Sequence, residues 1–417
     1  MHLNLKDLTI SSSSSLKQAL LKIEKNKYGL IFTLNKKNEV EGLATDGDIR
    51  RSLVEGVMLE DAISKCAHSN FIWADSETPR ETLIKQLDND IKFIPLLDKK
   101  KRLTSVITRD SIPLSAEQPI YIRSRAPVRV SFGGGGSDLT HYFSAEIGAV
   151  INSSISIYSH AVMRIRSDTR IIIKSLDLKD SIDVKNLEEL FLIDKKFGLI
   201  QSLLKVINPK FGFELYLNSD FPVGSGLGGS ASVAAAILGC FNHLRNDRWD
   251  SHDLAEIAFQ AERLHLGIAG GWQDQYAAVF GGFNFIEFEM EKNVIHPIRL
   301  KEETILELEE SLILCGTGID HHSGNIHKDQ KATMTSSSVR SLVKENVELT
   351  YLTRNHLLRG RLTEFGKCLN KAWELKKNFS DMITNDHIDR LYDNAIKNGA
   401  IGGKLLGAGG GGFFIFF

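Results

Sequence analysis

The pattern of apolar and polar positions divides the chain into two regions. Up to about residue 115, two apolar runs, at 30–34 and 93–97, are each followed by a polar turn, at 35–38 and 98–101. Around each run the pattern predicts a helix, a strand, a turn, a second strand and a second helix. The first region therefore predicts two copies of one small β-α-β-β-α module.

The second region has a different pattern. A strand is expected at 121–130, strands with a helix near 199–206 are expected within 151–220, and residues 231–282 are mainly helical. Amphipathic helices, such as 340–358, follow, and residues 413–417 predict a buried strand. The polar segment 115–119 separates the two regions and predicts a linker.

A glycine-rich loop is the most informative feature of the second region. Residues 222–232 contain four glycines and three serines, directly before an apolar helical run at 233–244. Glycines let backbone N–H groups converge, and a helix N-terminus adds partial positive charge, so the loop suits a phosphate. No lysine follows the glycines, which excludes the G-x-x-x-x-G-K-[ST] loop. A plain turn is the alternative.

Two further glycine clusters flank this loop. They are R-A-P-V-R-V-S-F-G-G-G-G-S-D-L at 125–139 and G-G-K-L-L-G-A-G-G-G-G-F at 402–413, with Gly270 and Gly271 between them. In order and spacing, residues 120–417 resemble the GHMP kinases, which phosphorylate galactose, homoserine, mevalonate and related small molecules. The first cluster follows the pattern R-A-P-x-R-x-S-F-x-G-G-G-[ST]-D-L of a sugar-1-kinase branch that acts on D-glycero-D-manno-heptose 7-phosphate.

The resemblance implies an α+β fold class with a two-lobed GHMP kinase fold. We expect a ribosomal S5-like, ATP-binding lobe at 120–300 and a ferredoxin-like lobe at 301–417. Family members normally continue beyond a strand such as 413–417, which leaves open whether the chain is truncated at Phe417.

The resemblance also implies how ATP and Mg²⁺ are held. ATP phosphates are expected on Gly224, Ser225, Gly226, Leu227, Gly228, Gly229, Ser230 and Ala231. The Ser230 hydroxyl and the Glu262 carboxylate match the family's metal ligands, and such hard oxygens suit Mg²⁺. Ser230 could instead only cap the helix, and Glu262 could lie on a solvated helix face. A family serine is replaced by Gly229, which removes one hydroxyl contact.

Catalysis is expected to depend on Asp274 and Arg129. A carboxylate beside a sugar hydroxyl can accept or orient its proton, and an arginine there offsets developing charge. The alternative for Asp274 is a helix N-cap.

The sugar is expected to bind mainly at the first and last glycine clusters. The expected residues are Arg125, Gly135, Gly136, Ser137, Asp138, Gly409 and Gly410. Arg125 either binds a sugar phosphate or pairs structurally, and the last cluster also suits a tight loop. A sugar phosphate carries a dianion, so the pocket should present an unpaired cation.

The first region resembles a tandem pair of CBS domains, at about 1–55 and 58–113 within residues 1–115. In such modules a threonine and an aspartate three residues apart contact an adenine nucleotide, and Thr45 and Asp48 match them. The second copy departs from the pattern, because Asp110 lies one residue early after Thr108. The alternative is a packing and dimerisation module without ligand, in a homodimer.

Composition changes this picture only by what it excludes. The chain has 42% hydrophobic and 25% charged residues and a net charge of −1, so no electrostatic attraction to nucleic acid or membranes is expected. Four distant cysteines lack zinc spacing and indicate reduced thiols. The chain shows no signal segment, and its apolar runs are too short to span a bilayer. We therefore expect a cytoplasmic protein.

Together these features predict an ATP-dependent sugar-1-kinase. The expected reaction converts D-glycero-D-manno-heptose 7-phosphate to the 1,7-bisphosphate, for nucleotide-activated heptose and surface polysaccharide. The alternative enzyme is a kinase for fucose or another free sugar. The non-enzyme alternative is a CBS-based adenine nucleotide sensor with an idle kinase fold, against which the retained Asp274, Ser230, Glu262 and Arg129 argue.

Overall fold

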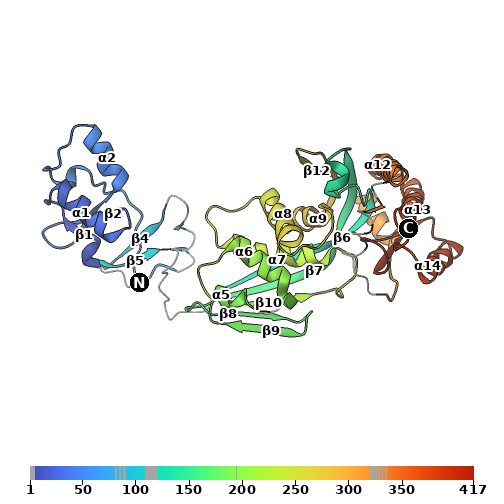
Figure 1. Ribbon diagram of the computed structural model, residues 1–417, viewed down its shortest axis with the longest axis horizontal. Coiled ribbons are helices and arrows are strands. Elements are labelled where there is room, and N and C mark those ends of the chain that lie inside the picture. The colour runs from blue at the N-terminus through green and yellow to red at the C-terminus, as the bar shows by residue number, and fades with distance from the viewer. Residues whose placement is uncertain are drawn as a thin grey trace. The chain divides into compact units, whose positions relative to one another are not determined.

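The computed structural model (Figure 1) describes most of the chain. The described residues are 5–79, 82–83, 86–87, 91–108, 120–193, 195–319, 326, 329, 332–333 and 336–417. The chain folds into two compact units. The smaller unit comprises Met1–Gln118 with Leu244–Arg248, and the larger unit comprises Pro119–His243 with Trp249–Phe417.

In the smaller unit the first predicted copy has its elements in the predicted order, and of the second copy the described elements include the two strands, while residues 109–115 lie outside the described residues. Its elements are η1 (Leu5–Asp7), β1 (Thr9–Ser11), α1 (Leu16–Asn26), β2 (Leu30–Leu34), β3 (Val40–Thr45), α2 (Asp46–Val54), η2 (Ile63–Lys65), β4 (Phe93–Leu97) and β5 (Leu103–Thr108). One sheet has the order β1-β2-β3, and β4 pairs with β5 in an antiparallel hairpin.

Local sequence explains why α1 forms. The Ser15 side chain accepts a hydrogen bond from Gln18 N at 3.3 Å, and Gln18 Oε1 accepts one from Ser15 N at 3.2 Å. This capping box satisfies N–H groups that the helix cannot satisfy itself. The strand predicted at 30–34 is confirmed. The linker 115–119 and Asp110 lie outside the described residues.

The larger unit is built on a mixed sheet whose order, in the described residues, is β12-β11-β7-β10-β8-β9, with β6 also paired to β7. Its strands are β6 (Tyr121–Gly133), β7 (Gly148–Ile165), β8 (Ile171–Ser175), β9 (Asp180–Val184), β10 (Phe213–Ser219), β11 (Phe283–Phe288) and β12 (Asn293–Pro297). A second sheet has the order β13-β15-β14, formed by β13 (Ile313–Gly316), β14 (Gly403–Leu405) and β15 (Phe413–Phe416).

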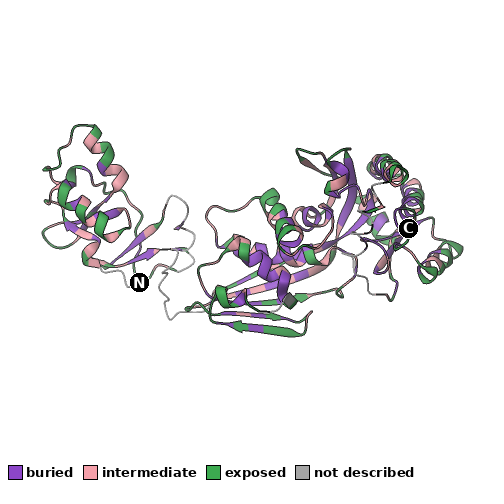
Figure 2. Cartoon of the chain, in the orientation of Figure 1, coloured by how far each residue is buried: buried purple, intermediate pink, exposed green. Residues whose placement is uncertain are grey.

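Helices cover these sheets. They are α4 (Thr140–Phe143), α5 (Leu187–Leu190), α6 (Gly198–Ile207), α7 (Gly229–His243), α8 (Ser251–Phe259), α9 (Gln273–Phe280), α10 (Glu302–Ser311), α12 (Ser337–Leu358), α13 (Leu362–Lys377) and α14 (Asp386–Lys397). Two short segments complete the unit: η3 (Lys195–Phe197) and a π-helical turn, η4 (Gln260–His265). Helices α7, α9 and α12 pack on β6 and β7, whose residues are largely buried (Figure 2).

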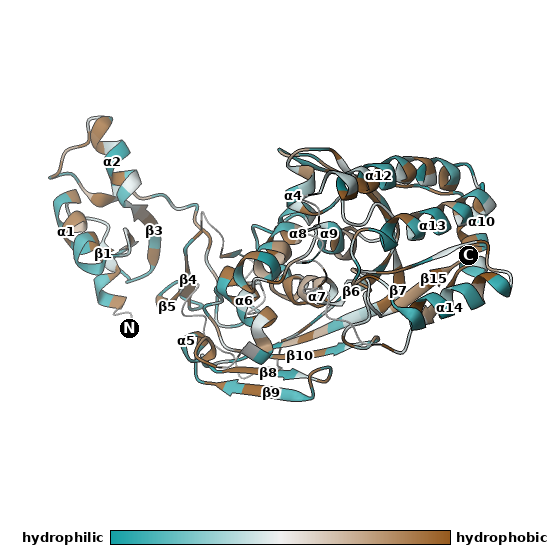
Figure 3. Cartoon of the chain, turned by 45° about the vertical axis from the view of Figure 1, so that its right-hand side comes forward, coloured by the Kyte–Doolittle hydropathy of each residue, from teal (hydrophilic) through white to brown (hydrophobic). Residues whose placement is uncertain are grey.

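One hydrophobic core connects the two sheets of the larger unit. Phe132 on β6 makes an edge contact with Phe365 on α13, with ring centroids 5.1 Å apart. Trp373 and Phe414 make a similar contact at 5.5 Å between α13 and β15. Burying a large apolar side chain contributes about 1.5–3 kcal/mol. Helices α12 and α13 carry both hydrophobic and hydrophilic residues (Figure 3), as their amphipathic sequences predict.

The predicted buried strand at the end of the chain is confirmed as β15, whose Phe414, Ile415 and Phe416 are buried. None of the helices in the described ranges has the length and hydropathy required to cross a membrane.

Candidate active site

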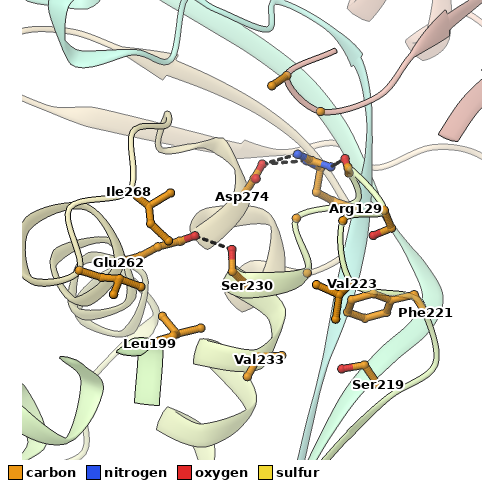
Figure 4. A pocket seen from close by; sticks show the side chains of 18 of the residues that line it. Arg129, Leu199, Ser219, Phe221, Val223, Ser230, Val233, Glu262, Ile268 and Asp274 are labelled. Carbon is orange, nitrogen blue, oxygen red and sulfur yellow. Dashed lines mark hydrogen bonds and ion pairs between the residues drawn. The ribbon is translucent and has the colours of Figure 1, made fainter. Parts of the chain in front are cut away.

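A pocket of about 740 Å³ lies in the larger unit. Apolar side chains form part of its wall: Phe197, Leu199, Leu217, Phe221, Val223, Val233, Leu266 and Ile268. Polar and charged groups form another part: Arg129, Ser131, Asp138, Ser230, Glu262, Gln273, Asp274, Lys376 and Lys404. Figure 4 shows Ser230 between these two sets, with Leu199 and Val233 on one side and Asp274 on the other. The pocket can therefore hold a molecule with one apolar end and one anionic or hydroxylated end.

The glycine-rich loop forms the start of α7. Gly224, Gly226 and Gly228 have φ angles of +78°, +74° and +78°, which side-chain-bearing residues rarely adopt. Among the described residues, no group accepts a hydrogen bond from the N–H of Gly229, Ser230 or Ala231. These donors, together with the partial positive charge of the helix N-terminus, form an anion-binding site.

Ser230 and Glu262 meet beside this loop. The Ser230 hydroxyl donates a hydrogen bond to Glu262 Oε1, and Gln275 Nε2 donates to Glu262 Oε2 at 2.7 Å. The π-helical turn η4 carries Glu262, which is only 2% exposed, and Arg263 Nη1 lies 3.3 Å from Glu262 Oε1. Such turns often occur at functional sites. A hydroxyl and a carboxylate oxygen next to a phosphate loop form a donor set that fits Mg²⁺.

Arg129 and Asp274 form an ion pair at the opposite end of the loop. Arg129 Nη2 and Nε lie 2.6 and 2.8 Å from Asp274 Oδ1, and Arg129 Nη1 donates to the Gly226 carbonyl at 2.9 Å. Arg129 is thereby fixed against both the carboxylate and the loop. No described residue donates a hydrogen bond to Asp274 Oδ2. This oxygen can therefore receive a proton or a hydrogen bond from a ligand.

Asp274 lies in the first turn of α9 but does not cap it, because the position before the helix is Trp272. The first turn of α9 is held instead by Asp138, whose Oδ2 accepts from Gln273 N at 3.2 Å. Asp138 Oδ1 accepts from Gly136 N at 3.2 Å. Burial raises the pKa of Asp138, and the nearby Asp274 carboxylate raises it further.

The structure brings some predicted sugar-binding residues to the pocket and not others. Gly135, Gly136 and Asp138 line it. Ser137 is fully buried beneath them, and its hydroxyl bonds to the Gly134 and Ala149 carbonyls at 2.8 and 3.1 Å. Its side chain is therefore used to close the loop.

Gly409, Gly410 and Arg125 do not line the pocket. Gly409 packs against Ile383, Gly410 packs against Ile326, and Gly410 N donates to the Ile383 carbonyl at 2.8 Å. Arg125 lies on the exposed side of β6, with its guanidinium 4.6 Å from the centroid of the Tyr158 ring. The reason is geometric: side chains alternate along a strand, and a bulge between Pro127 and Arg129 changes the alternation before the pocket.

Two lysines in the pocket were not singled out from the sequence. Lys376 on α13 donates to the Leu405 and Gly407 carbonyls at 3.0 and 2.6 Å. Lys404 on β14 is only 4% exposed. The sequence offers one feature that could have identified Lys404: it stands between glycines and leucines, in a segment whose other residues predict a buried strand.

In the smaller unit, Thr45 and Asp48 lie at the N-terminus of α2. Asp48 N donates to Thr45 Oγ1 at 3.2 Å, and Thr45 N donates to Asp48 Oδ2 at 2.8 Å. Burial opposes ionisation of Asp48, but hydrogen bonds from Thr45 and Arg51 outweigh it and lower its pKa. A shallow depression of about 650 Å³ nearby is lined by residues that include Gly29 and Asp46, but neither Thr45 nor Asp48.

Comparison with known proteins places these features in a family. Residues 194–282 match the profile of the GHMP kinases N terminal domain, residues 354–417 match the GHMP kinases C terminal profile, and residues 3–55 match the CBS domain.

Individual proteins give the same result. The chain is 35% identical over 302 residues to D-glycero-alpha-D-manno-heptose 7-phosphate kinase of Campylobacter jejuni, covering 71% of this chain and 89% of the relative. It is 26% identical to L-fucokinase/L-fucose-1-P guanylyltransferase of Bacteroides fragilis, covering 75% of this chain and 36% of that relative. The crystal structure of a D-glycero-D-manno-heptose 1-phosphate kinase from Bacteroides thetaiotaomicron superposes with a TM-score of 0.58 at 28% identity, over 71% of this chain and 88% of that one. The predicted α+β class and two-lobed architecture are confirmed, and the chain belongs to the GHMP kinases, with a CBS domain at its N-terminal end.

Proposed function

We propose that this protein transfers the γ-phosphoryl group of ATP to the anomeric hydroxyl of a sugar phosphate, D-glycero-D-manno-heptose 7-phosphate, and releases the 1,7-bisphosphate. The observation that carries the proposal is the Arg129–Asp274 ion pair beside the glycine-rich loop that leads into α7. Its substrate assignment is supported by the relative of 35% identity that acts on heptose 7-phosphate. The relative named as a fucokinase is less similar, at 26%.

In this proposal the ATP phosphates lie on residues 224–231. The unsatisfied N–H groups at the start of α7 bind phosphate oxygens, and the helix dipole favours their negative charge. The apolar wall, with Leu199, Phe221 and Val233, then holds the adenine base.

Mg²⁺ is the proposed metal, held by the Ser230 hydroxyl and the Glu262 carboxylate. When bound, the ion supplies positive charge that neutralises the phosphates during transfer. Magnesium needs only one or two protein oxygens in addition to those of the phosphates and water. Among the described residues, no three His, Cys, Asp or Glu side chains cluster as a metal site.

Asp274 is the proposed catalytic base. Arg129 holds Oδ1, so that Oδ2 can face the acceptor hydroxyl and take its proton as the oxygen attacks phosphorus. Arg129 also offsets the negative charge that develops on the transferred group. Asp138 and the backbone at Gly135 and Gly136 are proposed to bind the sugar hydroxyls.

The smaller unit is proposed to be a CBS pair, residues 1–115, that binds an adenine nucleotide weakly through Thr45 and Asp48, in a homodimer. Residues 120–300 and 301–417 are the proposed lobes of the kinase. Because the reaction consumes ATP, the proposed location is the cytoplasm.

Release of ADP from ATP tests the function directly. The purified full chain is assayed with Mg²⁺, ATP and a panel of acceptors: heptose 7-phosphate, free heptose, fucose and galactose. The proposal predicts the highest kcat/KM with heptose 7-phosphate. Faster turnover of fucose would favour a free-sugar kinase, and no acceptor-dependent ADP release would favour an idle nucleotide sensor.

A further inference from the structure

Lys404 is a buried amine without a partner. It lies on β14, lines the pocket and is 4% exposed, yet no described residue forms a hydrogen bond or ion pair with its Nζ. The other two cations of this part of the pocket are already engaged. Arg129 binds Asp274 and the Gly226 carbonyl, and Lys376 binds two backbone carbonyls. Lys404 Nζ is not among the fully buried unpaired atoms of the described residues, so it reaches the pocket and is open to a ligand.

The surroundings of Lys404 favour an anion. Arg129 on β6 adds positive charge, whereas Asp138 in the loop after β6 is the opposing carboxylate. Burial lowers the pKa of Lys376 on α13 well below its usual range, so this amine adds charge only when it is protonated. The neighbouring strand β15 contributes phenylalanines and an isoleucine only. Burial, and to a smaller extent the repulsion of Arg129, lower the pKa of Lys404 to about 7 against the opposing effect of Asp138. An incoming dianion would reverse that balance and favour the charged amine.

We propose that Lys404 binds an oxygen of a phosphate group on the acceptor side of the pocket and takes up a proton as it does so. The phosphate is either that of the sugar phosphate or the γ-phosphoryl group of ATP. This inference rests on the proposed function, and it gives the pocket the unpaired cation that the sequence led us to expect, for which Arg125 was one candidate. A lysine suits the role because its amine can be neutral in the free protein and charged in the complex.

Isothermal titration calorimetry of the full chain tests the inference without catalysis. At pH 8, titrations in two buffers of different ionisation enthalpy measure proton uptake on binding. With a free pKa near 7, Lys404 is mostly neutral at pH 8, so the complex should take up about 0.9 proton. Heptose 7-phosphate, free heptose and a non-hydrolysable ATP analogue are titrated separately. Uptake with heptose 7-phosphate identifies the sugar's phosphate as the ligand, and uptake with the analogue identifies the γ-phosphoryl group.

Variants separate Lys404 from other proton-binding groups. Lys404→Met should abolish the uptake and lower kcat/KM for heptose 7-phosphate roughly 10- to 100-fold, the size of a lost charge-assisted hydrogen bond. Lys404→Arg should bind phosphate better than Lys404→Met and keep activity above pH 7, because arginine stays charged. The kcat/KM of the wild type should fall above pH 7, because Lys404 loses its proton. Lys371→Met, which removes an exposed lysine of α13, is the matched control and should behave like wild type.

Thermal melts first establish that each variant is folded. Uptake that is equal in wild type and Lys404→Met, or a Lys404→Arg protein no better than Lys404→Met, would overturn the inference. Failure of the wild type to bind heptose 7-phosphate would instead count against the proposed function.

Discussion

Both units contain a helix start that the sequence singles out, and the two are built differently. At α2, Thr45 and Asp48 bond to each other and to the backbone N–H groups of their own helix. At α7, the preceding residue is Gly228, which has no side chain, and no described group accepts from the N–H groups of residues 229–231. The N–H groups at the helix start are capped by side chains in one unit and have no described acceptor in the other.

The start of α9 adds a third case. There the cap comes from Asp138, a residue more than a hundred positions earlier in the chain, so Asp274 is released for its ion pair with Arg129. A motif residue at a helix start therefore indicates function when its own side chain does not cap the helix and when a pocket lies beside it.

The largest effect is expected at Asp274. Asp274→Asn removes the negative charge that accepts the proton, so kcat should fall at least about 100-fold while ATP affinity stays nearly unchanged. Steady-state kinetics and calorimetry measure the two quantities. The control is Asp183→Asn, which breaks an exposed ion pair with Arg170 on the same unit. Near-normal turnover of Asp274→Asn would remove the residue from the mechanism.

A second experiment places a side chain at the glycine that precedes α7. In Gly228→Val, a Cβ would lie 3.3 Å from the Asp274 side chain, and a branched residue would have to adopt a φ of +78°. Affinity for an ATP analogue should fall roughly 10- to 100-fold, because backbone donors no longer reach the phosphates. Gly399→Val has a similar backbone strain, with φ +106° and open space around the glycine, and should cost stability only. Equal ATP affinities in the two variants would show that the loop is misassigned.

Asp138 should have a smaller effect, confined to the sugar. Asp138→Asn retains one acceptor for the backbone of Gly136 or Gln273 and loses the carboxylate, so KM for the sugar phosphate should rise roughly 10-fold. The KM for ATP and kcat should change less than about threefold. A fall in kcat with unchanged KM would place Asp138 in the chemical step instead, and melting curves check that the variant is folded.

The smallest effect is expected at α2. In the Gly228→Val background, in which the kinase pocket binds nucleotide poorly, the full chain should still bind AMP, ADP or ATP weakly. Asp48→Asn should abolish that binding, because the carboxylate that meets the ribose is removed. Since Thr45 still caps α2 and Asn keeps one acceptor, the cost in stability should stay below about 1 kcal/mol. If the nucleotide binds equally well without Asp48, the capping box is its whole role. Complete absence of binding leaves assembly, measured by sedimentation, as the function of the unit.

Much of the fold follows from local sequence. The helix start at Ser15, the strand at 30–34 and the helix at 340–358 agree with the structure because cap, period and length all favour one outcome. The boundaries differ where long-range contacts act: β6 extends three residues beyond 130 because β7 pairs with it as far as Gly133.

The site is less accessible to sequence reasoning. The motifs predicted that Arg129 and Asp274 act together, and the structure joins them although they are 145 positions apart. They could not predict which face of β6 carries Arg125, because a bulge decides it. Nor could they show that Lys404 lacks a partner, since that depends on how β14 and α13 pack.

The most direct test of the account identifies the product. Wild-type protein is incubated with Mg²⁺, ATP and heptose 7-phosphate, and the product is examined by ³¹P and ¹H NMR. We expect a second sugar phosphorus signal coupled to the anomeric proton, and with Asp274→Asn this signal should grow at least about 100-fold more slowly. A phosphate on any other carbon, or ADP formed without a phosphorylated sugar, would contradict it.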